Sequence, residues 1–475
     1  MPAKTFSIHG HFYQPPREDP LTNLIPNEPG AAPFDNWNDK ILAECYKPNA
    51  KLGNFAGISF NVGPTLFTWL QSRDQETYQQ IISQNQVNRQ RYGVGNAMAQ
   101  AYNHTILPLA SSSDKAIQIY WGIADFIHRF GHHPQGMWLP ETAVDYESLT
   151  MMANMGIEFT ILAPWQAEDD GLDPREPYKV ILPGGKSITI FFYQSDISAK
   201  VSFDPNATAD AVFFIEGELS SYFDGDDNNK SNDQFILIAS DGELYGHHQP
   251  SRERFLAEVL NGKSSTTKLF STFPALWLES HQPTKTIRIR ERTSWSCHHG
   301  VIRWSGECGC TSVDGRWKSQ LRRALDKLAS SLDGLYYETL YPVVPKPRVL
   351  RQEYIHAMLG EVRIESLISE IASHPLTSEQ TRQIVLLLES QRERQRIFTS
   401  CGWFFEDFDR IEPKNVIAYA AQAVRLARLA TGDDLAPQVA SDLKHVVSPR
   451  TGLTADQVFD YQLSRDWRPE DHLTT

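Results

Sequence analysis

The sequence of 475 residues predicts an α/β protein in which a barrel of parallel strands is followed by a helical C-terminal domain. Through residues 1–280, short continuous apolar runs alternate with helical patterns, which is typical of a parallel sheet covered on both faces. Beyond residue 316, apolar residues recur at three- and four-residue spacing, as they do in packed amphipathic helices. No GxGxxG motif follows the first strand, so a dinucleotide-binding fold is not indicated.

Apolar runs provide the strand candidates of the first region. They cover Phe6–His9, Gly57–Asn61, Gly136–Leu139, Phe159–Ala163, Ile188–Tyr193 and Phe235–Ser240. Helical patterns lie between them, over Pro64–Gln90, Asp114–Phe130 and Asp145–Met155. With this many strand and helix units in succession, a barrel is favoured over an open sheet.

The pattern divides the chain into three regions, because 475 residues are too many for one small core. Residues 1–280 are expected to form the barrel, and residues 281–316 an irregular connecting region rich in Trp, Cys and His. Residues 317–475 are expected to form the helical domain, with helices over Trp317–Leu332, Leu350–Ala372, Ser378–Thr399 and Pro413–Ala430.

Charge and composition narrow the range of partners. A net charge of −13 argues against nucleic acid or an anionic membrane as the main partner. The 11 tryptophans suit flat, uncharged ligands, although aromatic residues more often simply fill a core. Five cysteines, an odd number in a long chain, do not indicate a disulfide framework. No signal peptide or membrane-length apolar run is visible, so a cytoplasmic protein is expected, with no oligomeric state predicted.

Polar stretches follow several predicted strands, where α/β barrels hold their chemical groups. In HGHFYQP (residues 9–15), His9 and His11 share one face if the strand continues. They could bind a metal or hydrogen-bond a polyol, or they could simply be satisfied at a buried strand end. In GNAMAQAYNH (residues 95–104), the side chains of Gln100, Tyr102 and His104 alternate, so we expect them on one face of an extended segment. That face suits a sugar, but a polar loop would show the same residues.

Two further stretches carry acids. GMWLPET (residues 136–142) leads from a strand through Pro140 into Glu141, beside the ring of Trp138. Glu141 could be a catalytic group, or an acid that the helix macrodipole favours at a helix start. In ASDGELYGHH (residues 239–248), Asp241 lies just past a buried strand. Two acids at the ends of separate strands form a stronger pattern than either acid alone.

Paired carboxylates are what glycoside cleavage requires. One ionised carboxylate attacks or stabilises the anomeric carbon, while a second, protonated carboxyl donates its proton to the leaving oxygen. When the two are held about 5–5.5 Å apart, configuration is retained through a covalent glycosyl-enzyme. The acid needs a raised pKa, which burial or a nearby negative charge supplies.

The motifs HGHFYQP, GMWLPE and SDGELYGHH together resemble the signature regions of glycoside hydrolase family 57. The helical C-terminal part, with CGWFF at residues 401–405, resembles an uncharacterised helical domain that accompanies one branch of this family. The resemblance implies an incomplete (β/α)7 barrel, retaining chemistry and α-glucan substrates, as in its α-amylases, amylopullulanases, branching enzymes and 4-α-glucanotransferases. It also implies that Glu141 is the nucleophile, Asp241 the general acid/base, His11 the motif histidine and Trp138 the aromatic residue before the nucleophile.

Two departures from the family pattern concern substrate recognition. Gln100 stands where the family usually has a glutamate, and the final substrate-binding region has no secure counterpart beyond Trp295 or Trp304. We expect substrate contacts from His9, His11, Gln100, Tyr102, His104, Trp138, His247, His248, Trp295 and Trp304.

A cysteine- and histidine-rich stretch lies between residues 297 and 310. Cys297, His299, Cys308 and Cys310 would complete four positions for zinc. Because the CxC spacing is geometrically awkward, a rigid glycine-turned loop over the barrel mouth is favoured. We therefore expect no metal and no other cofactor.

Four functions remain open. A retaining α-glucan hydrolase with a polysaccharide or oligosaccharide substrate is favoured, and an α-glucan transglycosylase is its alternative, because the motifs do not indicate which acceptor is used. A metal-dependent carbohydrate enzyme would use His9, His11, Asp241 and His248 as ligands. A non-catalytic glucan-binding protein would need neither of the two acids.

Overall fold

A computed structural model describes residues 3–224, 233–262 and 268–467. The chain forms two compact units. The first contains Met1–Gln14, Asn27–Tyr102 and Gln118–His298, and the second contains Pro15–Pro26, Asn103–Ile117 and His299–Thr475. The division after His298 falls inside the predicted connecting region, whereas the two N-terminal segments of the second unit were not predicted.

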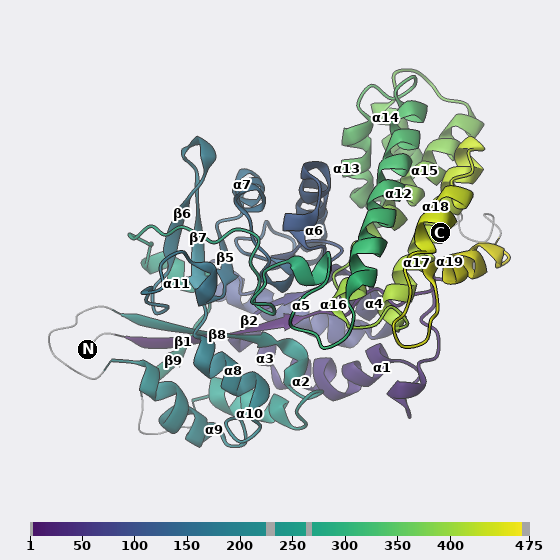
Figure 1. Cartoon of the computed structure of the whole chain (residues 1–475). Coiled ribbons are helices and arrows are strands. Elements are labelled where there is room, and N and C mark those ends of the chain that lie inside the picture. Colours follow the sequence, from purple (N-terminus) through teal and green to yellow (C-terminus); the bar gives the residue numbers. More distant parts are fainter. Residues whose placement is uncertain (1–2, 225–232, 263–267, 468–475) are drawn as a thin grey trace. The chain divides into compact units, whose positions relative to one another are not determined.

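Strand β1 (Lys4–Phe12) is the centre of the largest sheet in the first unit. It pairs in parallel with β2 (Ser59–Val62), β8 (Gln234–Asp241) and β9 (Leu269–Ser271). Figure 1 shows β1 and β8 side by side over most of their length. The register sets His11 opposite Asn61 on β2 and opposite Asp241 on β8. Three polar side chains from distant parts of the sequence therefore meet at the carboxyl ends of these strands.

Two smaller sheets continue the parallel pairing. Strand β3 (Ala99–Gln100) pairs with β4 (Met137–Trp138), and β5 (Phe159–Leu162) pairs with β7 (Ser187–Phe192). Single bridges join Phe60 on β2 to Ala97, two residues before β3, and Gly136, directly before β4, to Phe159 on β5. The N–H of Gln194 after β7 donates to Leu237 O on β8 at 2.7 Å. Strand β6 (Tyr178–Ile181) runs antiparallel to β7. Each of the six predicted apolar runs overlaps an observed strand, while β3, β6 and β9 were not predicted.

Helices fill most of the connections between these strands. The predicted helix Pro64–Gln90 is in fact two helices, because Asp74 breaks it and its side chain caps the second helix by accepting from the N–H of Thr77. The helices are α1 (Trp37–Ile41), α2 (Lys47–Leu52), α3 (Asn54–Gly57), α4 (Pro64–Arg73), α5 (Gln75–Tyr92), α6 (Ser112–Phe130), α7 (Tyr146–Asn154), α8 (Ser195–Phe203), α9 (Ala211–Phe213), α10 (Arg252–Leu260) and α11 (Pro274–Ser280).

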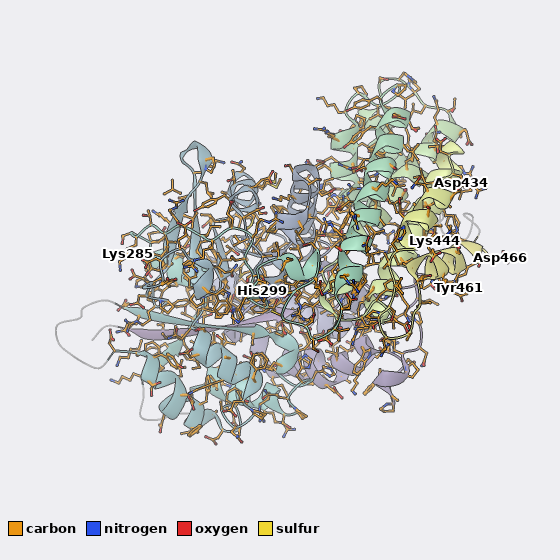
Figure 2. The ribbon with its side chains drawn as sticks, viewed as in Figure 1. Lys285, His299, Asp434, Lys444, Tyr461 and Asp466 are labelled. Carbon is orange, nitrogen blue, oxygen red and sulfur yellow. The ribbon has the colours of Figure 1, made fainter. Side chains whose placement is uncertain are left out.

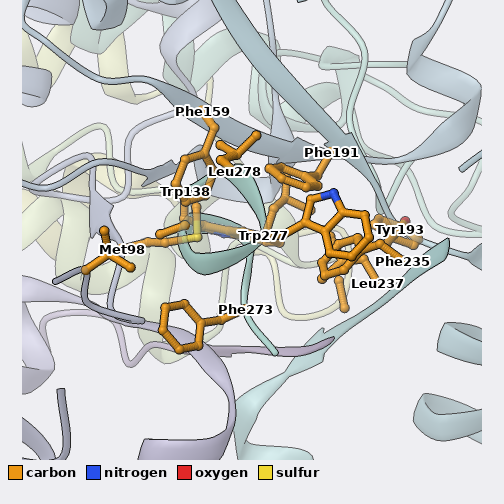
Figure 3. Packing of buried hydrophobic residues seen from close by; sticks show 14 of the residues in the cluster. Met98, Trp138, Phe159, Phe191, Tyr193, Phe235, Leu237, Phe273, Trp277 and Leu278 are labelled. Atoms are coloured by element: carbon orange, nitrogen blue, oxygen red, sulfur yellow. The ribbon is translucent and has the colours of Figure 1, made fainter. Parts of the chain in front are cut away.

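The apolar core of the first unit lies on one face of β4, β5, β7 and β8, against α11 (Figure 3). Strand β8 contributes Phe235, Leu237 and Ala239, which alternate along the strand and so share a face. The ring of Phe235 stacks on Trp277 at 5.1 Å between centroids. Asp241 is the next residue of the same alternation, so the hydrophobic face of β8 ends in a carboxyl group.

The second unit is helical over most of its described length. Its longest helices, α12, α15 and α17, pack against one another (Figure 1). Gly360, at a φ of 72°, separates two helices where one helix was predicted over Leu350–Ala372. No helix in the described ranges is long and apolar enough to cross a membrane. The helices are α12 (Arg316–Leu340), α13 (Pro347–Met358), α14 (Ile364–Ile371), α15 (Ser378–Arg396), α16 (Cys401–Phe404), α17 (Ile411–Thr431), α18 (Ala436–Leu443) and α19 (Ala455–Ser464).

A buried charge network ties the segment Asn103–Ile117 to the helices of the second unit. Arg394 on α15 contacts Asp114 at 2.6 Å and Asp333 on α12 at 2.8 Å. Arg351 on α13 contacts the same Asp333 at 3.0 Å. Buried charges of this kind need partners, and the two arginines share their carboxylates across three helices and the N-terminal segment.

Candidate active site

Glu141 lies in a strained turn directly after β4. Pro140 begins a single 3-10 turn, Pro140–Thr142, and Glu141 has φ 58° and ψ 21°. Thr142 also has a positive φ, of 48°. Such backbone conformations cost roughly 1–3 kcal/mol each for residues other than glycine, and they persist only where the surroundings enforce them. Strain of this kind is often concentrated at functional sites.

Gln166 holds this turn in place. Its Oε1 accepts hydrogen bonds from Thr142 Oγ1 at 2.8 Å and from the N–H of Ala163 at 2.9 Å. Its Nε2 donates to Thr142 O at 2.8 Å. Because Gln166 and Thr142 are both fully buried, breaking these bonds would leave polar groups without water to replace them.

The carboxylate of Glu141 is bound by the segment before Cys297. Trp295 Nε1 donates to Glu141 Oε2 at 3.0 Å, and Ser296 Oγ donates to the same oxygen at 2.8 Å. The N–H of Trp295 also donates to Glu141 O at 3.0 Å. Hydrogen bonds to an ionised carboxylate are stronger than those between neutral groups, so they fix the orientation of the glutamate side chain. Trp295 was expected at the substrate, and the structure places it directly on the candidate nucleophile.

Asp241 ends strand β8 on the face that carries the apolar core. The residue is exposed to solvent at the strand end, but the surrounding protein still removes much of the hydration of its carboxyl group. This desolvation, together with the negative charge of Glu141, raises the pKa of Asp241 to about 7. Because the charge of Glu141 must lie near Asp241 to raise its pKa, the two predicted acids belong to one site. A carboxyl group of this pKa can donate a proton near neutral pH and take it back.

His9 and His11 form a buried polar network with β2 and β3. Nδ1 of His9 lies 3.0 Å from Ser59 Oγ, and Nε2 of His9 lies 3.2 Å from Asn61 Oδ1. Nδ1 of His11 lies 3.0 Å from Asn61 Nδ2, and Asn61 Nδ2 donates to Gln100 Oε1 at 2.7 Å. Burial lowers the pKa of His9 to about 3 and that of His11 to about 4, so both rings are neutral. Neutral imidazoles can donate to or accept from a sugar hydroxyl.

Trp138 was expected to contact the substrate, and the structure buries it completely. Its ring stacks instead on His9, at 4.6 Å between centroids, and on His11, at 5.1 Å. The edge of Trp295 meets it at 5.1 Å. Trp138 therefore supports the histidines and Trp295, and it cannot touch a substrate in this arrangement.

The expected alternation of Gln100, Tyr102 and His104 is wrong beyond Gln100. Strand β3 ends at that residue, and His104 has a φ of 55°. His104 is buried within the second unit, where its Nδ1 lies 2.5 Å from Ser400 Oγ. Tyr102 meets the edge of Trp121, at 5.5 Å between centroids. His104 is thus a packing residue of the second unit in this structure.

The remaining candidates make contacts of their own. His247 pairs with Glu44 at 2.6 Å, and its ring lies 5.0 Å from that of His248. Burial and the charge of His247 lower the pKa of His248. Trp304 is buried in the second unit, where its ring lies 6.1 Å from that of Phe404.

Glu243 was not singled out from the sequence, although it lies two residues after Asp241. It is buried, and its Oε1 accepts from Tyr46 OH at 2.6 Å and from the N–H of Tyr13 at 3.1 Å. Desolvation first, and then the charge of Asp241, raise the pKa of Glu243 to about 8. The sequence signal that could have identified Glu243 was the presence of a second acid in the same motif as Asp241.

A metal site built from His9, His11, Asp241 and His248 does not form. In the described ranges, ligand atoms of His, Cys, Asp and Glu come together in one group suited to an ion, and that group is Cys297, His299, Cys308 and Cys310. The imidazole nitrogens of His9 instead face Ser59 and Asn61. The metal-dependent hypothesis therefore lacks its ligands.

The family model described as glycosyl hydrolase family 57 matches residues 6–290. The chain belongs to glycosyl hydrolase family 57. As a member of this family, it is an enzyme of the glycosyl hydrolase class. A second model, described as a domain of unknown function (DUF3536), matches residues 314–460. No curated protein matches the sequence.

Solved structures of several enzymes share the fold at low sequence identity. The exo-type maltose-forming amylase of Pyrococcus sp. ST04 is 14% identical with a TM-score of 0.72, over 92% of this chain and 82% of that one. The branching enzyme of Thermococcus kodakaraensis is 14% identical with a TM-score of 0.59, over 97% and 94%. The α-amylase AmyC of Thermotoga maritima is 13% identical with a TM-score of 0.55, over 98% and 100%.

Proposed function

We propose that this member of family 57 hydrolyses α-glucans with retention of configuration, with Glu141 as nucleophile and Asp241 as general acid/base. The observation that carries the proposal is the raised pKa of Asp241, which follows from its recessed position and from the charge of Glu141. Two carboxyl groups whose environments differ in this way are suited to the two roles of glycoside cleavage.

The scaffold of this site is proposed to be an incomplete (β/α)7 barrel. The parallel pairings of β1 with β2 and β8, of β3 with β4 and of β5 with β7 support it. The single bridges that link β2 to the residues before β3, and the residue before β4 to β5, support it further, as does the hydrogen bond from Gln194 to Leu237. In such a barrel, the carboxyl ends of the strands gather the catalytic groups at one face.

In the first step, an oxygen of ionised Glu141 attacks the anomeric carbon while Asp241 donates its proton to the departing glycosidic oxygen. A glycosyl ester of Glu141 forms, and the leaving chain departs as an alcohol. Because the ester carries no charge, Glu141 no longer raises the pKa of Asp241 at this stage. The lower pKa suits Asp241 for the second step, in which it takes a proton from water as that water attacks the anomeric carbon and releases Glu141.

The neutral ring of His11 supplies a polar group beside these acids, whereas His9 is completely buried, with both ring nitrogens bonded, and supports the network. Asn61 fixes both rings and is itself fixed by Gln100, so the network arrives preorganised for sugar hydroxyls. An amide at position 100 adds no further negative charge beside the two acids. We propose that Gln100 positions Asn61 rather than taking part in proton transfer.

Transfer to a second glucan is the alternative outcome of the same chemistry. The acceptor in the second step would then be a sugar hydroxyl, and Asp241 would deprotonate it in place of water. The fold similarity to a branching enzyme and to the 4-α-glucanotransferase of Thermococcus litoralis, at a TM-score of 0.56, keeps this alternative open.

Product analysis of the purified enzyme on maltooligosaccharides, amylose and amylopectin tests the proposal. Hydrolysis predicts shorter sugars with new reducing ends, whereas redistributed lengths indicate disproportionation and new branch points indicate branching. Glu141→Gln and Asp241→Asn should each lower the rate on the order of 10³-fold or more. The exposed Glu76→Gln on α5 serves as the control and should keep the wild-type rate. Full activity in either active-site variant would refute the assignment of roles, and binding without any product would identify a glucan-binding protein.

A further inference from the structure

Cysteine and histidine side chains converge in the loop of residues 297–310. One ligand atom from each of Cys297, His299, Cys308 and Cys310 lies within 4.8 Å of every other. Nδ1 of His299 is 3.2 Å from Cys310 Sγ and 3.5 Å from Cys308 Sγ. Cys297 and Cys308 are buried, whereas His299 and Cys310 are exposed (Figure 2 labels His299). The group therefore has a protected side and an accessible side.

Two of these spacings are close to those of a tetrahedral metal site. Zinc binds thiolate sulfur at about 2.3 Å and imidazole nitrogen at about 2.0–2.1 Å, which separates its ligand atoms by about 3.5–3.8 Å. The distances from His299 Nδ1 to the two sulfur atoms lie close to that range. Three thiolates and one imidazole are a ligand set that selects zinc over magnesium or calcium, since those ions prefer oxygen.

Glycines allow the loop to bring the four residues together. Gly300 follows His299 with a φ of 73°, which reverses the chain where a larger residue would be strained. Gly309 separates the two cysteines of the CxC pair, and a Cβ there would lie 3.5 Å from the His299 ring. A Cβ at position 309 would make an ordinary contact, so the observation that supports a shared site is that both sulfur atoms of the CxC pair lie within 3.5 Å of His299 Nδ1.

We propose that Cys297, His299, Cys308 and Cys310 bind a structural zinc ion. The site lies outside the chemistry proposed for Glu141 and Asp241, and it requires no step of that mechanism. The zinc site is connected to the active site through the chain, because Cys297 directly follows Ser296, whose hydroxyl donates to Glu141. An ion held by Cys297 would fix the end of the segment that orients the nucleophile.

Metal analysis of the full-length protein, purified without a metal-chelating tag, tests this proposal. We expect one zinc per chain by mass spectrometry, and none in a Cys308→Ser/Cys310→Ser variant. Cys401→Ser, a change to a cysteine outside the group, is the matched control and should keep the full zinc content. Replacement of zinc by cobalt in the wild-type protein should give the intense near-ultraviolet absorption of thiolate-to-cobalt charge transfer.

A variant on the exposed side avoids a general loss of folding. His299→Ala should weaken zinc binding by about 10-fold or more, because it removes one of the four ligands while leaving the buried sulfurs in place. Wild-type protein that binds neither zinc nor cobalt would overturn the proposal, as would thiols that prove to be joined in disulfides. Zinc content is measured without substrate, so its outcome is independent of the proposed glucan chemistry.

The proposed link between the zinc ion and Glu141 is tested by a separate measurement. After zinc removal by a chelator, amide hydrogen exchange should speed up in residues 294–300 while β1 and β8 stay protected. Unchanged exchange in those residues would show that the ion does not anchor the segment.

Discussion

Ser296 donates a hydrogen bond of 2.8 Å to Oε2 of Glu141, a residue 155 positions earlier in the chain. Trp295 donates to the same oxygen at 3.0 Å. One carboxylate oxygen is thus held by two donors from a single short segment. The geometry of the proposed nucleophile depends on a loop that lies beyond the last strand of the first unit.

Ser296→Ala should lower kcat/KM by about tenfold. Loss of one hydrogen bond to a charged group costs about 1.5–3 kcal/mol, and Trp295 still holds the carboxylate. Steady-state kinetics on a maltooligosaccharide measure the effect. Ser83→Ala, a change on the exposed face of α5, is the control and should leave the rate unchanged. An unaltered rate in Ser296→Ala would mean that Trp295 alone orients Glu141.

The pH profile should report the protonation of Asp241. As the general acid it must carry a proton, so kcat/KM should fall as pH rises above about 7, the pKa of this carboxyl. Rates measured from pH 5 to pH 9 show whether this descending limb is present. A rate that stays constant to pH 9 would contradict the role assigned to Asp241.

Asp241→Asn separates proton donation from nucleophilic attack. With α-maltosyl fluoride, fluoride leaves without a proton, so the first step should lose far less rate than it does with a maltooligosaccharide. With this substrate, the fall in kcat/KM above about pH 7 should also disappear. An equal loss of rate on both substrates would indicate that the variant damages the site rather than the acid.

The gain in stability that Glu243→Gln gives over the wild-type protein should increase as pH rises. The pKa of Glu243 is raised from 4.5 to about 8 in the folded state, so between these values the folded protein keeps a proton that the unfolded chain releases. The free energy of unfolding therefore falls as pH rises through this window, by up to about 1.4 kcal/mol per pH unit. Glutamine cannot ionise, and it can still accept from Tyr46 and Tyr13.

Chemical denaturation at pH 5 and at pH 8 measures this difference. The gain of Glu243→Gln over wild type should be larger at pH 8 than at pH 5 by a few kcal/mol. Glu76→Gln, on the exposed face of α5, should show no such change with pH. A constant difference between wild type and Glu243→Gln would show that Glu243 ionises normally in the folded protein.

Strands that are buried on both faces were predictable, because each appears as a continuous apolar run. The strands that were missed carry little local signal: β3 has two residues, and β6 is a partly exposed strand antiparallel to β7. The assignment of Pro15–Pro26 and Asn103–Ile117 to the second unit depends on long-range contacts. One of these is the ion pair between Asp114 and Arg394, which no local pattern indicates.

The strand-end position of an acid was visible in the sequence, and it led to Glu141 and Asp241. The groups that hold Glu141 were not visible, since Ser296 and Gln166 come from other segments of the chain. For His104, a pattern was visible in the sequence, but the prediction drawn from it was wrong. An alternating pattern suggested a shared face, but a single residue with φ 55° turned the side chain toward Ser400.

Gln166→Leu should disable the enzyme through the backbone of Glu141. The change removes three hydrogen bonds to buried groups of Thr142 and Ala163, each worth about 1–3 kcal/mol when its partner is left unsatisfied. Without them, the positive φ values of Glu141 and Thr142 should relax toward ordinary turn geometry. The nucleophile would then lie away from the anomeric carbon, so kcat should fall more than KM rises.

Thermal unfolding and steady-state kinetics should be measured together on Gln166→Leu. Gln438→Leu, at an exposed position on α18, is the control and should change neither. A second variant, Thr142→Gly, tests the strain itself, because glycine accepts a φ of 48° without cost. Thr142→Gly should retain more activity than Gln166→Leu, since it keeps the bond from Gln166 Nε2 to the backbone carbonyl. Equal loss in both variants would assign the effect to the Thr142 hydroxyl rather than to the geometry of the turn.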